Sequence, residues 1–298
     1  MNIRSGLISQ GSAIPAGGRA AHGVSALSVA AFAYSFLFRH FWLVLRVLLI
    51  PIFTAGLVLY VCLSAYISEL LLFLGSPGPQ VASVALGTLA AGIFLSLFCY
   101  SIAVSSVMNI LLGKPQRNPL ALVKTQRQDW RVYAAYLRLL LIITASLLAI
   151  FLVGGYVAPL IGISQAATPW VLTLASAATA YWLVARIGFL VAPVIAGGEG
   201  PVLRAAWSRS KRSALRNCFL IALLVAPGCL VWFSGEFLFR VDSAIPYAGA
   251  GSTLAEYANA MAQTLGQFVA VARASAFVSI ILLTAGAMHG YAKNPRVN

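Results

Sequence analysis

Long stretches without a charged residue recur along most of this chain of 298 residues. The longest covers residues 139–185, and others cover residues 47–68 and 274–291. Eighteen or more consecutive apolar residues are typical of a helix that crosses a lipid bilayer. Charged residues make up only 9% of the chain, whereas about a quarter is usual in a soluble domain. The sequence therefore predicts an integral membrane protein.

The apolar runs predict an all-α fold, a polytopic membrane helix bundle of six spans. Gly154, Gly155, Pro159 and Pro169 divide the longest run into two crossings, because glycine and proline favour breaks. The predicted spans are residues 47–68, a segment within 81–112, and residues 139–160, 169–195, 219–239 and 274–291. A polar loop is expected before the last span.

Residues 1–23 are predicted to be a disordered tail, and residues 24–298 a single transmembrane domain. The tail is rich in Gly, Ser and Ala and has few large apolar groups. Residues 24–38 lack charges but as a helix would be only about 22 Å long, shorter than a bilayer core of about 30 Å. We favour an interfacial helix there, with insertion as the alternative.

The formal net charge of +14 gives the expected orientation. Seventeen of the 20 Lys and Arg residues fall in the N-terminal region, in residues 114–138, in residues 204–216 and in the C-terminal tail. Arg240 and Arg273 are assigned to the opposite loops, and Arg186 lies within a span. Because basic residues are retained on the cytoplasmic side, we predict that both termini lie in the cytoplasm. The start, with Arg4 and Arg19, is also compatible with a mitochondrial transit peptide.

An internal similarity suggests that the domain contains repeats. The first copy, residues 39–50, reads RHFWLVLRVLLI, and the second, residues 131–142, reads RVYAAYLRLLLI. A weaker third copy, RNCFLIALLVAP, ends at Pro227. We predict three repeats, each an interfacial amphipathic helix followed by a two-span hairpin.

Basic residues on the two later amphipathic helices predict contact with lipid. A helix beginning at Asn118 and Pro119 would align its cations on one stripe, and a helix over residues 201–217 would gather its cations within an arc of roughly 160°. Trp207 would lie at headgroup depth. The expected partners are anionic lipid headgroups on the cytoplasmic side and not nucleic acid. The predicted headgroup-binding residues are Lys124, Arg127, Arg131, Arg204, Arg209, Lys211, Arg212 and Arg216.

Arg186 is the intramembrane candidate for a functional site, because a charge within a span is expensive. It could bind an anion or a lipid headgroup in a cavity open to the cytoplasm. Alternatively, its long side chain snorkels or satisfies helix-end carbonyls beside Pro193. Ser101, Ser105 and Asn109 recur every four residues, which favours close helix packing over a polar transport route.

Signals for catalysis and metal binding are weak. Ser208 and Lys211 fit an S-x-x-K pattern, but its usual companion motifs do not occur. His22, His40 and His289 stand singly and form no metal-ligand cluster. We therefore expect no cofactor, no metal and no enzymatic activity.

Residues 185–217 carry a resemblance to known membrane-protein families. They read ARIGFLVAPVIAGGEGPVLRAAWSRSKRSALRN. This run resembles bacterial six-span families that are similar to the membrane domain attached to some glycerophosphodiester phosphodiesterases. Arg186, Pro193, Ala206, Trp207 and Ser210 occupy the matching places. The resemblance implies a fold and an inner-membrane location, and no activity, because the sequence contains no phosphodiesterase catalytic domain.

Two functions are considered. The first is a non-enzymatic accessory protein of the envelope that contacts anionic lipid, with an unidentified membrane-protein partner as an open option. The second is a small transporter or permease with a route near Arg186.

Overall fold

A computed structural model gives the fold, and it describes residues 25–75, 79–114, 126–160, 162, 164–198, 200–211, 213–239 and 254–292. Every regular element in these ranges is helical, as predicted. The predicted tail, residues 1–23, lies outside them. The predicted turn between the first two spans, at residues 76–78, also lies outside them.

Six helical segments are long and apolar enough to cross a membrane, which confirms a multi-pass membrane protein. The candidate spans are Phe41–Ile67, Leu86–Leu111, Arg127–Ala158, Thr168–Ala196, Ala214–Gly235 and Val269–Ala292. They lie on helices α3 (Phe41–Gly75), α4 (Pro79–Leu111), α5 (Arg127–Leu160), α6 (Thr168–Leu183) with its continuation, α9 (Ala214–Phe239) and α10 (Leu254–Ala292). The continuation of α6 is a π-helical turn, η2 (Val184–Gly188), followed by α7 (Phe189–Ala196).

Small residues bring consecutive spans into close contact. In the α3–α4 pair, the Ser96 hydroxyl donates a hydrogen bond to the Ala55 carbonyl at 3.2 Å. In the α9–α10 pair, a Cβ placed on Gly228 would lie 2.2 Å from the Ser279 hydroxyl oxygen. Without a hydrophobic drive between helices in lipid, such close backbone packing supplies much of the association.

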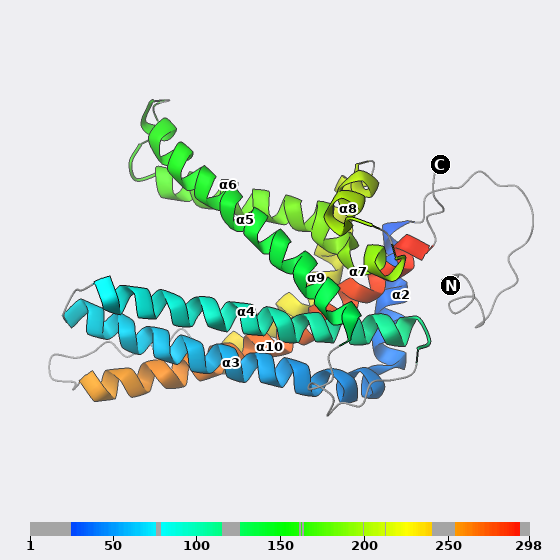
Figure 1. The fold of residues 1–298 in the computed structure, drawn as a ribbon, viewed down its shortest axis with the longest axis horizontal. Coiled ribbons are helices and arrows are strands. Elements are labelled where there is room, and N and C mark those ends of the chain that lie inside the picture. Colours follow the sequence, from blue (N-terminus) through cyan, green and yellow to red (C-terminus); the bar gives the residue numbers. More distant parts are fainter. Residues whose placement is uncertain are drawn as a thin grey trace, which may run out of the picture.

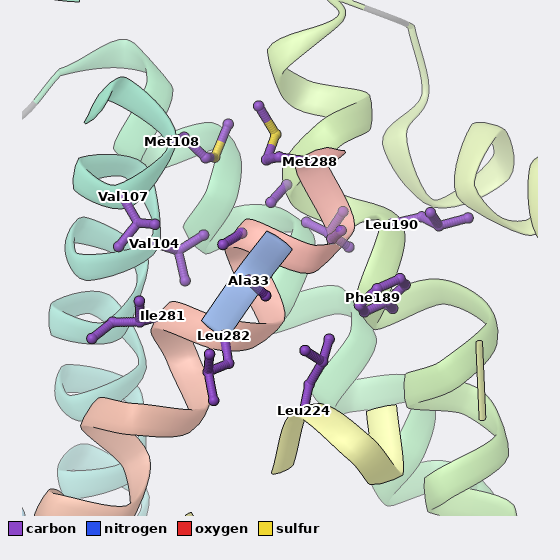
Figure 2. Packing of buried hydrophobic residues seen from close by; sticks show 14 of the residues in the cluster. Ala33, Val104, Val107, Met108, Phe189, Leu190, Leu224, Ile281, Leu282 and Met288 are labelled. Carbon is purple, nitrogen blue, oxygen red and sulfur yellow. The ribbon is translucent and has the colours of Figure 1, made fainter. Parts of the chain in front are cut away.

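The buried core lies where α2 (Ala26–Arg39), α4, α7, α9 and α10 meet. Figure 2 shows side chains from these helices packed around α2 and α10. The labelled members are Ala33, Val104, Val107, Met108, Phe189, Leu190, Leu224, Ile281, Leu282 and Met288. Because seven of the eight residues of α7 are buried, the core fixes the turn that follows this helix.

The α5–α6 pair diverges from the pair formed by α3 and α4 (Figure 1). Only 6% of the apolar stretch of the α5 span is buried inside the protein. The corresponding share is 56% for the span that runs from α6 into α7. The outward side chains of this arm are apolar, including Leu152, Leu160 and Trp170. An apolar, unpaired helix surface of this kind suits contact with lipid.

Helix α2 crosses the direction of α3 and α4 (Figure 1). Its N-cap is Ser25, whose hydroxyl accepts a hydrogen bond from the Ser28 amide at 3.2 Å. Phe32 stacks on His289 of α10 with 3.8 Å between ring centroids, and the Tyr34 hydroxyl donates to the Leu223 carbonyl of α9. The helix is therefore held by a side chain of α10 and a backbone carbonyl of α9, while its interfacial position stays a prediction.

The two later amphipathic helices differ from their predicted form. α5 continues without a break from Arg127 to Leu160, so a separate basic helix ending before the span is wrong for this part of the chain. Its predicted start at Asn118 and Pro119 lies outside the described residues. The helix expected over residues 201–217 is also divided, because α8 (Val202–Ser210) ends before α9 begins at Ala214.

The polar loop expected before the sixth span is partly helical. α10 begins at Leu254, twenty residues before the predicted start of the span, so Arg273 lies in a helix and not in a loop. The physical reason is visible in the sequence: the polar residues Glu256, Asn259, Gln263 and Gln267 recur with helical spacing among alanines. The prediction used the last charge as the boundary of the span and missed this pattern.

Candidate functional site

Arg186 lies at the middle of the π-helical turn η2. The Phe189 amide donates to the Val184 carbonyl, five residues earlier, and not to the Ala185 carbonyl as in an α-helix. Pro193 also lacks the amide hydrogen that would reach the Phe189 carbonyl. Arg186 is about 15 Å of helix from the Ala196 end of the span. The irregular backbone and the intramembrane charge therefore coincide.

The Arg186 guanidinium packs on the face of Trp207. Its central carbon lies 3.6 Å from the Trp207 ring centroid, which is a close cation–π contact. The Arg186 Nε atom is buried and has no hydrogen-bond partner within the described part of the chain. Within the described residues, the Trp207 ring is therefore the main group that stabilises the Arg186 charge.

Asn217, at the start of α9, supports the same turn. Its side-chain amide nitrogen donates to the Ala185 carbonyl at 3.3 Å, and only 1% of Asn217 is exposed. The shifted hydrogen bonds of the π-turn make this carbonyl available. The interaction connects η2 directly to α9.

A glycine turn places α8 beside η2. Gly198 adopts a left-handed backbone with φ of 72°, which L side chains rarely accept. After this turn, Ala206 and Ser210 of α8 are buried, whereas Arg204 and Lys211 are exposed. Since α8 contacts α7 and η2, it lies over the Ala196 end of the fourth span with basic side chains on its outer face.

Arg209 connects α8 to the end of the sixth span. Its guanidinium carbon lies 4.7 Å from the ring centroid of Tyr291 on α10. A Cβ added to Gly197 would lie 2.8 Å from the Tyr291 hydroxyl oxygen, so the same tyrosine also fits against the glycine turn. Two cation–π contacts thus hold α8: its Trp207 packs on Arg186 of η2, and its Arg209 packs on Tyr291 of α10.

The predicted headgroup-binding residues are distributed over three helices. Arg204 and Arg209 lie on α8, Lys211 follows it directly, and Arg216 lies on α9. The single arc expected for a continuous helix therefore does not form. Arg127 and Arg131 are exposed at the start of α5. Lys124 and Arg212 lie outside the described residues.

The row of small polar residues on α4 is inside the bundle. Ser101 and Ser105 have no exposed surface, and Asn109 is 6% exposed. The Ser101 hydroxyl donates to the Leu97 carbonyl of its own helix at 2.8 Å. This burial supports the packing interpretation of the row.

Sequence reasoning missed a second arginine within the spans. Arg273 of α10 places its guanidinium carbon 5.2 Å from the ring centroid of Tyr100 on α4. Its Nε is also buried without a hydrogen-bond partner in the described ranges. The sequence does contain a signal for this position. Residues 257–272, which precede Arg273, also carry no charge, so Arg273 interrupts a longer uncharged segment.

No family model, no curated protein and no solved structure matches the chain.

Proposed function

We propose that this protein is a non-enzymatic component of the bacterial inner membrane that binds anionic phospholipid headgroups at its cytoplasmic face. The exposed side chains of Arg204 and Lys211 carry this proposal. Arg204 lies on the outer face of α8, whose other face is packed against the fourth span, and Lys211 follows this helix directly. Each basic group at the end of a span contributes about 1 kcal/mol to the binding of anionic headgroups.

Other basic residues extend this surface. Arg127 and Arg131 are exposed near the start of α5, and the distribution of Lys and Arg in the sequence supports a cytoplasmic position for both segments. From the sequence pattern, we assign Lys124, Arg209, Arg212 and Arg216 to the same proposed surface, which we call the basic face. Trp207, which is 38% exposed, adds an indole of the kind found at headgroup depth.

Binding of lipid to the purified full-length protein tests the proposal. Phosphatidylglycerol is titrated into the protein in zwitterionic detergent, and bound lipid is counted by native mass spectrometry. The double variant R204Q/K211Q should need roughly 30-fold more lipid for half-saturation, because it loses two contributions of about 1 kcal/mol each. The control R240Q removes a cation that the sequence assigns to the opposite side of the membrane and should change binding by less than threefold. Equal binding by wild type and R204Q/K211Q would refute the proposal.

We also propose that the chain is a distant member of the six-span families that it resembles. The contact between Arg186 and Trp207 supports this, because it joins two of the matching positions. Three antiparallel hairpins, α3–α4, α5–α6 and α9–α10, are compatible with a threefold repeat. A structure of one such relative with the same arginine–tryptophan contact would test the assignment.

A small transporter with a route near Arg186 is the second candidate. The observation in its favour is the π-helical turn at Arg186, since transporters build substrate sites from interrupted membrane helices. Reconstituted wild-type protein should then accelerate the uptake of small organic anions into liposomes, and R186Q should abolish the uptake. Uptake that is the same with R186Q and wild type would exclude a route through this arginine.

A further inference from the structure

Arg273 is enclosed by three helices. It belongs to α10, its guanidinium faces Tyr100 of α4, and its aliphatic part passes over Gly56 of α3. A Cβ on Gly56 would lie 3.1 Å from the Arg273 Cγ and 3.3 Å from its Cδ. An alanine at position 56 would therefore require the arginine to shift by a few tenths of an ångström.

The partners of Arg273 lie at the middle of their spans. Gly56 is about 22 Å from the Phe41 end and about 16 Å from the Ile67 end of the first span. Tyr100 is about 21 Å and about 16 Å from the ends of the second span. The Arg273 guanidinium therefore lies beside the middle of α3 and α4, although Arg273 itself is about 6 Å of helix from the Val269 end of the sixth span.

A charge at this depth is unfavourable by at least about 2.5–3.5 kcal/mol. The contact with Tyr100 offsets about 0.5–2 kcal/mol of this. Snorkelling is a poor solution here, because the aliphatic part is packed on Gly56 and the head is held at Tyr100. The arginine thus retains a charge that its described neighbours compensate only in part.

The Arg273 guanidinium also has a hydrogen-bond donor without an acceptor among the described residues. Its Nε is buried and has no partner among the described groups, while the residue as a whole is only partly buried. A guanidinium has five N–H donors in a planar fork that matches the two oxygens of a carboxylate or phosphate. An oxyanion beside the open part of the group would satisfy both the charge and these donors.

We propose that Arg273 and Tyr100, with Gly56 as the surface on which the arginine rests, form an oxyanion-binding site within the membrane. The ligand carries a carboxylate or phosphate group. It belongs either to an amphiphile that enters from the lipid or to a small solute. This site uses none of the residues of the basic face and does not depend on the function proposed for it.

The site is tested with the full-length protein in zwitterionic detergent micelles. Thermal unfolding is followed by intrinsic tryptophan fluorescence while inorganic phosphate, acetate or dihexanoyl phosphatidic acid is added. The wild-type melting temperature should rise with saturation for at least one of these compounds. A response to phosphate or acetate identifies a solute site, and a response to phosphatidic acid alone identifies a lipid site.

Four variants separate ligand binding from a structural role. R273Q should lose the saturable rise, and without added oxyanion it should melt no lower than wild type, because an incompletely compensated charge has been removed. R273K should bind at least tenfold more weakly, since lysine lacks the planar fork, and G56A should also weaken binding. R138Q, which removes an exposed arginine of the α5 span that belongs to neither proposed site, should respond as wild type does. The proposal is overturned if no compound raises the wild-type melting temperature, or if R273Q and wild type respond equally. Should R273Q fail to fold, unchanged binding by both R273K and G56A would overturn it.

Discussion

The Arg186 guanidinium carbon and the Trp207 ring centroid are 3.6 Å apart, although the two residues lie on different helices. The glycine turn after α7 reverses the chain between them. This contact has two consequences: it shields an intramembrane charge, and it docks α8 against the fourth span. Both consequences can be measured through stability.

A double-mutant cycle should reveal the energy of this contact. We expect R186Q and W207L to be coupled by about 1 kcal/mol in the free energy of unfolding, because a desolvated cation–π pair contributes about that much. Unfolding is measured in mixed micelles with increasing SDS. As a control, W170L removes an indole on α6 that is 73% exposed and should show no coupling with R186Q. Additivity of R186Q and W207L within about 0.3 kcal/mol would contradict the contact.

Loss of the Asn217 side chain should destabilise the π-helical turn. N217A removes the donor to the Ala185 carbonyl in a site that is 1% exposed, so we expect the free energy of unfolding to fall by about 1–3 kcal/mol. S105A is the matched control, since the buried Ser105 hydroxyl has no hydrogen-bond partner among the described residues. Its removal should be neutral or slightly stabilising. Equal destabilisation by N217A and S105A would show that the amide does not support the turn.

Gly228 should be essential for the contact between α9 and α10. A methyl group there would lie 2.2 Å from the Ser279 hydroxyl oxygen and 3.0 Å from the Ser275 carbonyl oxygen. Because one of these neighbours is backbone, we expect G228A to lower the free energy of unfolding by about 1–3 kcal/mol.

Gly155 provides the matched control for this variant. It also lies within a helix, but nothing is within 4 Å of a Cβ placed there. G155A should therefore be neutral or stabilising by up to about 1 kcal/mol, since alanine favours a helix over glycine. Equal stability of G228A and wild type in SDS titrations would contradict the packing of α9 on α10.

The number and approximate position of the spans could be predicted from the sequence, because a helix in lipid must be both long and apolar. The start of α10 cannot be placed by this criterion, because the charge of Arg273 predicts the edge of the bilayer at that residue. Likewise, the helix expected over residues 201–217 has good amphipathic periodicity, yet it is divided between α8 and α9. Periodicity describes faces and does not show where tertiary packing requires a turn.

The candidate site was only partly predictable for a related reason. The apolar surroundings of Arg186 in the sequence identified it as unusual, and the predicted resemblance to six-span families drew attention to Trp207. Their contact, however, depends on the turn at Gly198 and on the docking of α8. The contact of Arg273 with Tyr100 joins residues that are far apart in the sequence, so no local pattern indicates it.

We predict that six spans place the basic segments on the cytoplasmic side. The most direct test is cysteine labelling in intact cells, in a background in which Cys62, Cys99, Cys218 and Cys229 are replaced by alanine. Single substitutions S76C and A250C should react with a membrane-impermeant maleimide from outside. Q116C and S213C should react only after the membrane is permeabilised, because their loops carry the clustered Lys and Arg residues. Labelling of S76C and Q116C from the same side would contradict the six-span arrangement and the cytoplasmic position of the basic face.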